Sequence, residues 1–322
     1  MNRRDKDLPL NPALPKNSVK AATDNKSSVA RQLVHNALNK AKPLKAKRSL
    51  PAFKYQPYLI SYLDVLGMKA LVESAGENAD GVAEVLTRLC SYSNPEPEDK
   101  KLWKTGFVNF SDLVLRSIPI LTEANLKYRL GCFFHEAMDL GFIQVNLINR
   151  GILVRGALTI GLLCRQKGLL FGQGLIDAHN LEEKQAVYPR IIISEDLMTS
   201  VEELPVLRGE GNSFKEEMAC LRKLVKRDSD GLWFLDYLAH ARDEADDPYE
   251  YASLLSAHRE LIENQRAEIA TLPPGEKLTE SRIEKLRWLI KLHNTHLGEN
   301  DAEIFQRETE TPLAPLYVQG IP

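Results

Sequence analysis

The order of strand-like and helical segments is the feature that most constrains how this chain can fold. Apolar, β-prone runs alternate with helical periodicity over the first 200 residues. The strand-like runs lie at 58–66, 103–120, 152–161 and 189–194, with helical patterns at 68–92 and 126–149 and a short strand leading into a helix at 169–183. The run at 103–120 reads as a hairpin that turns near 109–111. This order, β-α-β-β-α-β-α-β, predicts an α+β fold with a ferredoxin-like, split βαβ arrangement.

Composition divides the chain into three regions, at 1–50, 51–200 and 201–322. Residues 1–50 hold twelve Lys and Arg against three Asp, although the whole chain has a net charge of −2. A basic segment rich in Pro, Asn, Ala and Ser is typical of a disordered, solubilising arm. The arm carries no recognition motif, so we expect no stable nucleic-acid partner.

Residues 201–322 are expected to form a helical C-terminal extension to a domain at 51–200. Two helical patterns, at 244–270 and 278–297, are joined by a Pro-Gly turn. In the second pattern, apolar residues recur every three or four positions, which predicts an αα-hairpin with one apolar face. We expect that face to pack on the core or to form a dimer contact.

The sequence also indicates the cellular compartment of the protein. No apolar run approaches the roughly 18 residues that a membrane span needs, and the N-terminal residues have no apolar stretch typical of a signal peptide. The four cysteines are scattered, without a CxxC pair or a histidine at zinc spacing. These features favour a cytoplasmic protein with reduced thiols and no membrane partner.

Two acids stand inside otherwise apolar strand patterns. Asp64 lies in YLISYLDVL and Asp112 lies in VNFSDLVL. A carboxylate in such a place is unfavourable unless a cation compensates it. If the two strands are neighbours, the carboxylates approach each other and a divalent cation would relieve their repulsion. The alternative is that Asp112 caps a turn after Ser111 while Asp64 pairs with an arginine.

A set of ordered motifs resembles the class III nucleotidyl cyclase catalytic domain, and is similar above all to the bacterial pyrimidine cyclases of the Pycsar anti-phage systems. The motifs are ISYLDVLGMKAL, NFSDLVLRS, RGALTIG, LFGQGLIDAHNLEE and YPRIIIS. They cover about residues 56–196, under half of the chain. The resemblance implies a homodimer, since in this family the nucleotide site lies between two catalytic domains.

The resemblance also implies roles for individual residues. Asp64 and Asp112, with the backbone carbonyl of Val65, would hold two divalent cations, Mn²⁺ or Mg²⁺. One ion would lower the pKa of the ribose 3′-OH, and the other would hold the triphosphate while diphosphate leaves. Arg155, at the start of RGALTIG, matches the arginine that binds the terminal phosphates, a task that suits a planar guanidinium. A surface arginine at a strand end is the alternative.

The positions that read the base depart from those of the purine cyclases. Val108, followed by Asn109, stands where those enzymes have a lysine, and Asn180 stands where they have an arginine that stabilises the transition state. Tyr62 shares a strand face with Asp64 and is able to stack on a base or to hydrogen-bond it, with a core tyrosine as the alternative. The candidate substrate-binding residues are Tyr62, Asn109, Arg155 and Asn180.

The preferred function is cyclisation of UTP to 3′,5′-cyclic UMP with release of diphosphate, as a second messenger in anti-phage defence. The alternatives, in order, are a CTP cyclase, an ATP or GTP cyclase of the wider class, and a non-catalytic nucleotide-binding sensor. A diguanylate cyclase is excluded because its hairpin carries GG(D/E)EF, whereas this hairpin reads NFSDL. His135 and His179 are expected to be structural, and Gly172 and Gly174 to form a strand-to-helix turn.

Overall fold

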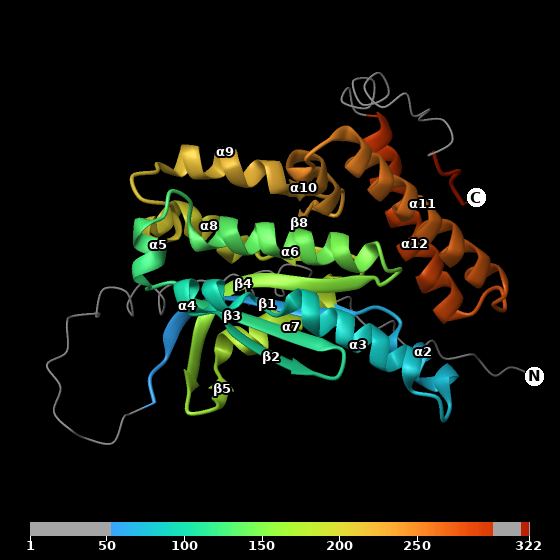
Figure 1. Cartoon of the computed structure of the whole chain (residues 1–322), viewed down its shortest axis with the longest axis horizontal. Helices are drawn as coiled ribbons and strands as arrows, with labels where there is room; N and C mark the ends of the chain where they lie inside the picture. The colour runs from blue at the N-terminus through green and yellow to red at the C-terminus, as the bar shows by residue number, and fades with distance from the viewer. Residues whose placement is uncertain (1–52, 299–316, 322) are drawn as a thin grey trace, which may run out of the picture.

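The computed structural model describes residues 53–298 and 317–321 (Figure 1). The basic arm expected at 1–50 therefore lies outside the described residues. In this described part, eight strands form one sheet in the order β2-β3-β1-β4-β6-β8-β7, with β5 paired to β4. The strands are β1 (Gln56–Val65), β2 (Gly106–Phe110), β3 (Leu113–Pro119), β4 (Val154–Gln166), β5 (Leu169–Phe171), β6 (Ile191–Ile193), β7 (Val225–Arg227) and β8 (Trp233–Leu235).

Helices connect these strands and cover the sheet (Figure 1). They are α2 (Met68–Ala75), α3 (Asp80–Ser93), α4 (Pro97–Trp103), α5 (Glu123–Lys127), α6 (Cys132–Ile148), α7 (Gln173–Gln185), α8 (Glu195–Glu203), the 3₁₀ turn η1 (Pro205–Leu207), α9 (Phe214–Leu224), α10 (Tyr237–Glu244), α11 (Pro248–Ala270) and α12 (Lys277–Gly298). None of the described helices is both long and apolar enough to cross a membrane.

Strand β1 is the centre of the predicted split βαβ arrangement. It pairs antiparallel with both β3 and β4, β2 and β3 form the hairpin, and β6 joins β4 in parallel. The α+β, ferredoxin-like fold is therefore confirmed. The hairpin turns between Phe110 and Leu113, next to the predicted position.

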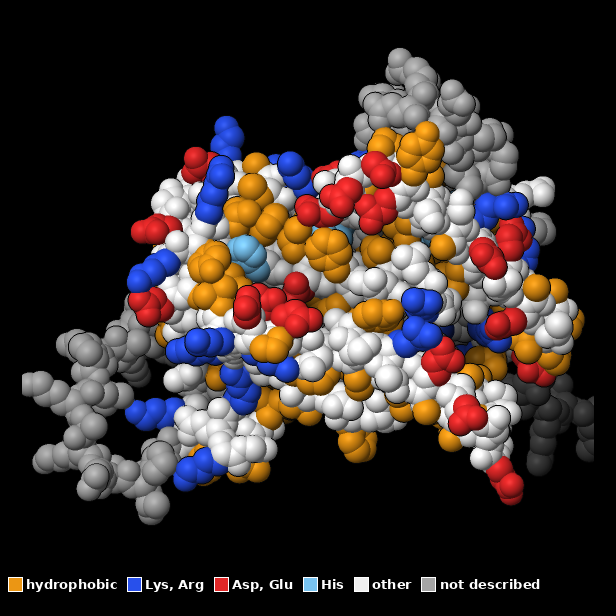
Figure 2. Space-filling model, viewed as in Figure 1, with side chains coloured by type: hydrophobic (Ala, Val, Ile, Leu, Met, Phe, Trp, Pro, Cys, Tyr) orange, Lys and Arg blue, Asp and Glu red, His pale blue; other side chains and the backbone are white. Residues whose placement is uncertain are grey.

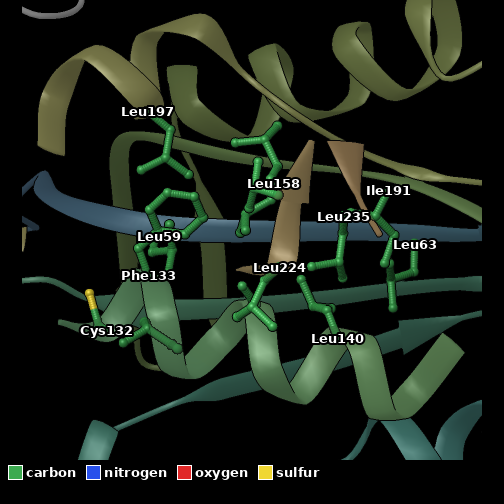
Figure 3. Close-up of a cluster of buried hydrophobic side chains, with 14 of the residues drawn as sticks. Leu59, Leu63, Cys132, Phe133, Leu140, Leu158, Ile191, Leu197, Leu224 and Leu235 are labelled. Carbon is green, nitrogen blue, oxygen red and sulfur yellow. The ribbon is translucent and has the colours of Figure 1, made fainter. Parts of the chain in front are cut away.

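Both faces of β1 are buried, because side chains alternate along a strand. Leu59 and Leu63 point into the main hydrophobic core beneath α6, where they meet Phe133 and Leu140 (Figure 3). Ile60, on the other face, packs in a smaller cluster beneath α7. Helices on both faces thus hold the central strand, and its polar residues must be accommodated between them.

The C-terminal region is not wholly helical, contrary to the prediction for residues 201–322. β8 pairs antiparallel with β6, and β7 pairs with β8, so the sheet continues past residue 200. Leu224 and Leu235 lie in the same hydrophobic core as Leu158 of β4 (Figure 3). Each added strand has three residues, which is too short for a recognisable alternation of apolar and polar side chains.

The predicted αα-hairpin is present as α11 and α12, which pack around a second hydrophobic cluster. Trp288 of α12 donates a hydrogen bond from Nε1 to Asp228 Oδ2 at 2.6 Å. Asp228 in turn pairs with the fully buried Arg190, whose backbone carbonyl accepts a hydrogen bond from Gly156 of β4 at 3.1 Å. The hairpin is therefore attached to the sheet beside the start of β4.

Candidate active site

The register of the central strands brings Asp64 and Arg155 together. Asp64, near the end of β1, lies opposite Leu113 of β3 on one side and Arg155 of β4 on the other. Directly paired residues present their side chains on the same face of a sheet. Arg155 Nε accordingly donates a hydrogen bond to Asp64 Oδ2 at 3.1 Å. Asp64 therefore has the arginine partner that the sequence analysis gave as its alternative.

Asp112 reaches this group from the turn between β2 and β3. The preceding Ser111 has a φ of 54°, a left-handed conformation that closes the turn. Asp112 is half-buried, and its carboxyl group contacts that of Asp64. Burial raises the pKa of Asp64, Arg155 opposes this rise, and the charge of Asp112 adds to it. The two acids singled out in the sequence therefore lie together, in a place that concentrates negative charge.

Glu182 is a third carboxylate of this group, and the sequence analysis missed it. It lies on α7 with 3% of its surface exposed, and its Oε1 is 2.8 Å from Arg155 Nε. Burial raises the pKa of Glu182, Arg155 lowers it, and Asp64 raises it. The Nε of Arg155 thus lies between two carboxylates, while its Nη1 and Nη2 make no hydrogen bond with the described residues.

Two glycines set α7 close against the sheet. A Cβ on Gly174 would lie 2.5 Å from Ile60 Cδ1 and 2.9 Å from Gly161 Cα, so a side chain there would push the helix away. Ala178 and Glu182 follow Gly174 at four-residue intervals, and both are buried against the sheet. The strand-to-helix turn expected here is present, and Gly174 serves helix packing. This four-residue spacing is the signal that could have identified Glu182.

Tyr62 lies on the same face of β1 as Asp64, as the sequence predicts. Its ring centroid is 5.5 Å from that of His179, which is about half-exposed on α7. Burial raises the pKa of Tyr62, and the nearby carboxylates raise it further. His179, expected to be structural, therefore borders the group of acids. His135 packs against Trp103, away from it, in the structural role that was expected.

Asn109, which was predicted to bind substrate, is not brought to this group. It pairs with Val114 of β3, which lies in the main core beneath α6. Since paired residues share a face, Asn109 is on the face of the sheet opposite to Asp64. A shift of one residue along a strand is enough to cause this difference.

Asn180 is on α7, but it does not face the acids either. Its side-chain amide donates to the backbone carbonyl of Ile176 at 2.8 Å, and its Oδ1 accepts from Lys184 Nζ at 2.7 Å. Two residues along a helix correspond to about 200° of rotation, so Asn180 and Glu182 point in nearly opposite directions. Within this chain Asn180 therefore has no contact with the candidate site.

Lys285 of α12 is a cation that no sequence pattern connected to the site. The side chain is half-buried, and its Nζ donates to Ser281 Oγ at 3.2 Å. Burial lowers the pKa of Lys285, and the neighbouring cations Arg155 and Arg282 lower it further. The docking of α12 beside β4 thus places a second cation in the neighbourhood of Arg155.

The acids at this site form a small donor set for a divalent ion. The described residues hold no group of three or more His, Cys, Asp or Glu side chains arranged for a metal. Asp64 and Asp112 nevertheless fit Mg²⁺ or Mn²⁺ bound with a nucleotide, because Mg²⁺ typically takes one or two carboxylates and completes its coordination with water and phosphate oxygens. Val65, whose backbone carbonyl the sequence resemblance adds to this set, is buried at the end of β1 directly after Asp64.

No family model matches this chain, and curated proteins give no match. Among solved structures, it is similar to the dimeric guanylyl cyclase domain of the RhoGC fusion protein from the aquatic fungus Blastocladiella emersonii, at 18% identity over 47% of this chain and 86% of that chain, with a TM-score of 0.33. It is also similar to the guanylyl cyclase Cya2, at 13% identity over 57% of this chain and 93% of that chain (TM-score 0.37).

A third similar structure is a class III adenylyl cyclase-like ATP-binding protein from Pseudomonas aeruginosa, at 14% identity over 65% of this chain and 54% of that chain (TM-score 0.34). These TM-scores are all below 0.5.

Proposed function

We propose that this chain is a metal-dependent nucleotidyl cyclase, which converts a nucleoside triphosphate into a 3′,5′-cyclic monophosphate and diphosphate. The observation that carries the proposal is the meeting of Asp64, Asp112 and Arg155 at one end of the central strands. Two carboxylates suit divalent cations, and a guanidinium suits phosphate. UTP is the preferred substrate and CTP the second. A role of the product as a second messenger in anti-phage defence rests on the sequence resemblance.

Asp64 and Asp112, with the carbonyl of Val65, would hold two Mn²⁺ or Mg²⁺ ions. Bound there, the ions supply the Lewis acidity that favours loss of the 3′-OH proton and offsets charge on the leaving diphosphate. The side chain of Asp64 is 23% exposed, so a cation can reach it from solvent. The backbone of β1 and the β2–β3 turn fix where the two carboxylates stand, and so would fix where the ions are held relative to the nucleotide.

Cations near Asp64 support binding of the triphosphate. Neither Nη atom of Arg155 has a hydrogen-bond partner among the described residues, since only its Nε contacts the carboxylates. Lys285 forms no ion pair with a described residue, and its pKa is lowered by burial and by Arg155. A half-buried ammonium beside another cation is unfavourable in the free protein, and an anion between the two would stabilise both. Phosphate oxygens are such an anion.

The neighbourhood of Tyr62 supports a small base. Val108 is paired with Leu115, which is paired with Tyr62, so the three lie in one row across the sheet on the face of Asp64. Val108 is half-exposed and offers an apolar wall. Tyr62 and the adjacent His179 offer polar atoms that can hydrogen-bond the carbonyl groups of a pyrimidine.

Exposed apolar residues on the face of Asp64 support a homodimer. Val108 and Phe110 of β2 share that face through their pairing with β3, and Phe110 is 76% exposed. Hydrophobic side chains line the lower edge of the molecule in Figure 2, where Figure 1 has β2. Grouped apolar exposure of this kind is typical of protein interfaces.

A non-catalytic nucleotide sensor is the second candidate, favoured by the hydrogen bond that engages Asp64 with Arg155. The two candidates are separated by incubating the protein with UTP and Mn²⁺ while measuring nucleotide binding and diphosphate release together. A cyclase releases one diphosphate for each UTP consumed. Stoichiometric binding of UTP with no diphosphate released would favour the sensor.

A further inference from the structure

We infer that Glu182 is the alternative acceptor for the Nε–H of Arg155, and that it thereby frees Asp64 to bind a cation. The inference rests on the proposed function, because it assigns Asp64 to metal binding. Glu182 is a positioning residue in this account. It acts on the metal site through Arg155 and does not touch the ion.

The hydrogen-bond geometry at Arg155 leaves one carboxylate unsatisfied. The Nε atom carries a single hydrogen. It lies 3.1 Å from Asp64 Oδ2 and 2.8 Å from Glu182 Oε1, and the hydrogen is directed at Asp64. Glu182 Oε1 is buried and has no hydrogen-bond partner among the described residues, despite its shorter distance to Nε. A small rotation of the guanidinium would transfer the hydrogen bond from Asp64 to Glu182.

Asp64 and Glu182 differ in how far they are exposed to solvent. The side chain of Asp64 is 23% exposed, whereas that of Glu182 is 4% exposed. A cation arriving from solvent therefore meets Asp64, and Glu182 stays beneath Arg155. The close packing of Gly174 on Gly161 holds α7, and with it Glu182, at a fixed distance from β4.

Without Glu182, binding of a cation at Asp64 would leave Arg155 without an acceptor. A half-buried guanidinium N–H that loses its partner is strongly unfavourable. The same cation would also be repelled by a guanidinium that still faced Asp64. With Glu182 in place, Arg155 exchanges one charged acceptor for another, so Asp64 becomes available to the cation with little loss of free energy. The Nη atoms stay free for phosphate throughout.

The test is Mn²⁺ binding to the whole protein without nucleotide, measured by titration calorimetry or by the loss of the free Mn²⁺ electron paramagnetic resonance signal. Glu182→Gln should weaken Mn²⁺ binding about tenfold, because the neutral amide competes poorly for the Nε–H. Glu183→Gln removes the same charge from the next, exposed position of α7 and should change binding less than twofold. Thermal melting confirms that each variant is folded.

A double-mutant cycle with Arg155→Gln separates positioning from direct ligation. Arg155→Gln alone should strengthen Mn²⁺ binding, and adding Glu182→Gln in that background should have no further effect. A loss of affinity that persists without Arg155 would make Glu182 a ligand and overturn the inference. Equal Mn²⁺ affinity in wild type and Glu182→Gln would also overturn it, yet leave the proposed cyclase standing. If Glu182→Gln weakens Mn²⁺ binding as expected but the wild-type protein cyclises no nucleotide, only the proposed function is overturned.

Discussion

Arg155 Nε donates a hydrogen bond to Asp64 Oδ2 at 3.1 Å, and the two residues are direct partners in the antiparallel pairing of β4 with β1. Their contact is therefore fixed by the strand register, which the packed core on both faces of β1 maintains. The arrangement gives Arg155 two connected tasks. It holds Asp64 in the free protein, and its Nη atoms are available for phosphate.

Arg155→Ala should raise the KM for the nucleotide by about 10- to 150-fold, since one charge-assisted contact contributes about 1.5–3 kcal/mol. Arg155→Lys should recover only part of this loss, because an ammonium cannot offer two parallel donors. Steady-state kinetics on both variants measure the effect. An unchanged KM in Arg155→Ala would assign the residue a structural role.

Tyr62→Phe should reduce the preference for pyrimidine over purine triphosphates more than it reduces total activity. The phenol lies on the face of the sheet that carries Asp64. If it hydrogen-bonds a pyrimidine, a purine in the same place leaves the hydroxyl group unpaired, which disfavours the purine. Rates with UTP, CTP, ATP and GTP for the variant and the wild type provide the comparison. If the four relative rates stay the same, Tyr62 does not read the base.

Gly174→Ala should lower the free energy of unfolding by about 1–3 kcal/mol, because its Cβ would lie 2.5 Å from Ile60 Cδ1. Activity should fall as well, since the displaced α7 carries Glu182. Gly81→Ala is the matched control, with no atom within 4 Å of the added Cβ, and should be neutral or slightly stabilising. Denaturant unfolding measures the stability of both variants. Equal stability of the two variants would contradict the close packing of α7.

Asp236→Asn should detach the C-terminal hairpin from the sheet. Asp236 accepts from His296 of α12 at 2.9 Å and pairs with Lys226 of β7 at 2.9 Å. Although burial alone would raise its pKa, these partners hold the pKa of Asp236 below the usual carboxyl range. Loss of a buried, paired charge reduces stability by about 3–5 kcal/mol.

The pH dependence of this loss has a definite sign. Asp236 has a lowered pKa in the folded protein, so its contribution is complete above the unfolded carboxyl pKa of about 3.9 and disappears as the pH falls below it. The stability difference between wild type and Asp236→Asn should therefore be large at pH 7 and shrink below about pH 4. Asp243→Asn, in a partly exposed pair, is the control and should lose less than about 1 kcal/mol. A difference that grows on acidification would contradict this account.

The fold was predictable where the segments are long. Residues 58–66 and 152–161 are apolar over enough positions to identify strands, and the intervening helical patterns are equally clear. β7 and β8 could not be predicted, because three residues such as Val225–Arg227 show no period. Their place in the sheet is determined by pairing with β6, which is a long-range contact.

The site was predictable only in part, for a similar reason. Asp64 and Asp112 were identified because an acid within an apolar strand needs a partner. Glu182 stands beside Glu183 in a polar stretch, and its burial, marked in the sequence only by its four-residue spacing from Ala178 and Gly174, depends on the approach of Gly174 to Gly161. Asn109 was assigned to the site from its place in the chain, but alternation along β2 turns it to the other face.

The central claim is that Asp64 and Asp112 support cyclisation of a nucleoside triphosphate. The most direct test is to incubate the purified protein with Mn²⁺ and each of the four ribonucleoside triphosphates, and to identify the products by mass. We predict 3′,5′-cyclic UMP from UTP, with cyclic CMP second, and no product from Asp64→Asn or Asp112→Asn. A preference for ATP or GTP would contradict the pyrimidine assignment. If the folded protein forms no cyclic nucleotide from any of the four, or if either variant retains wild-type turnover, the central claim is wrong.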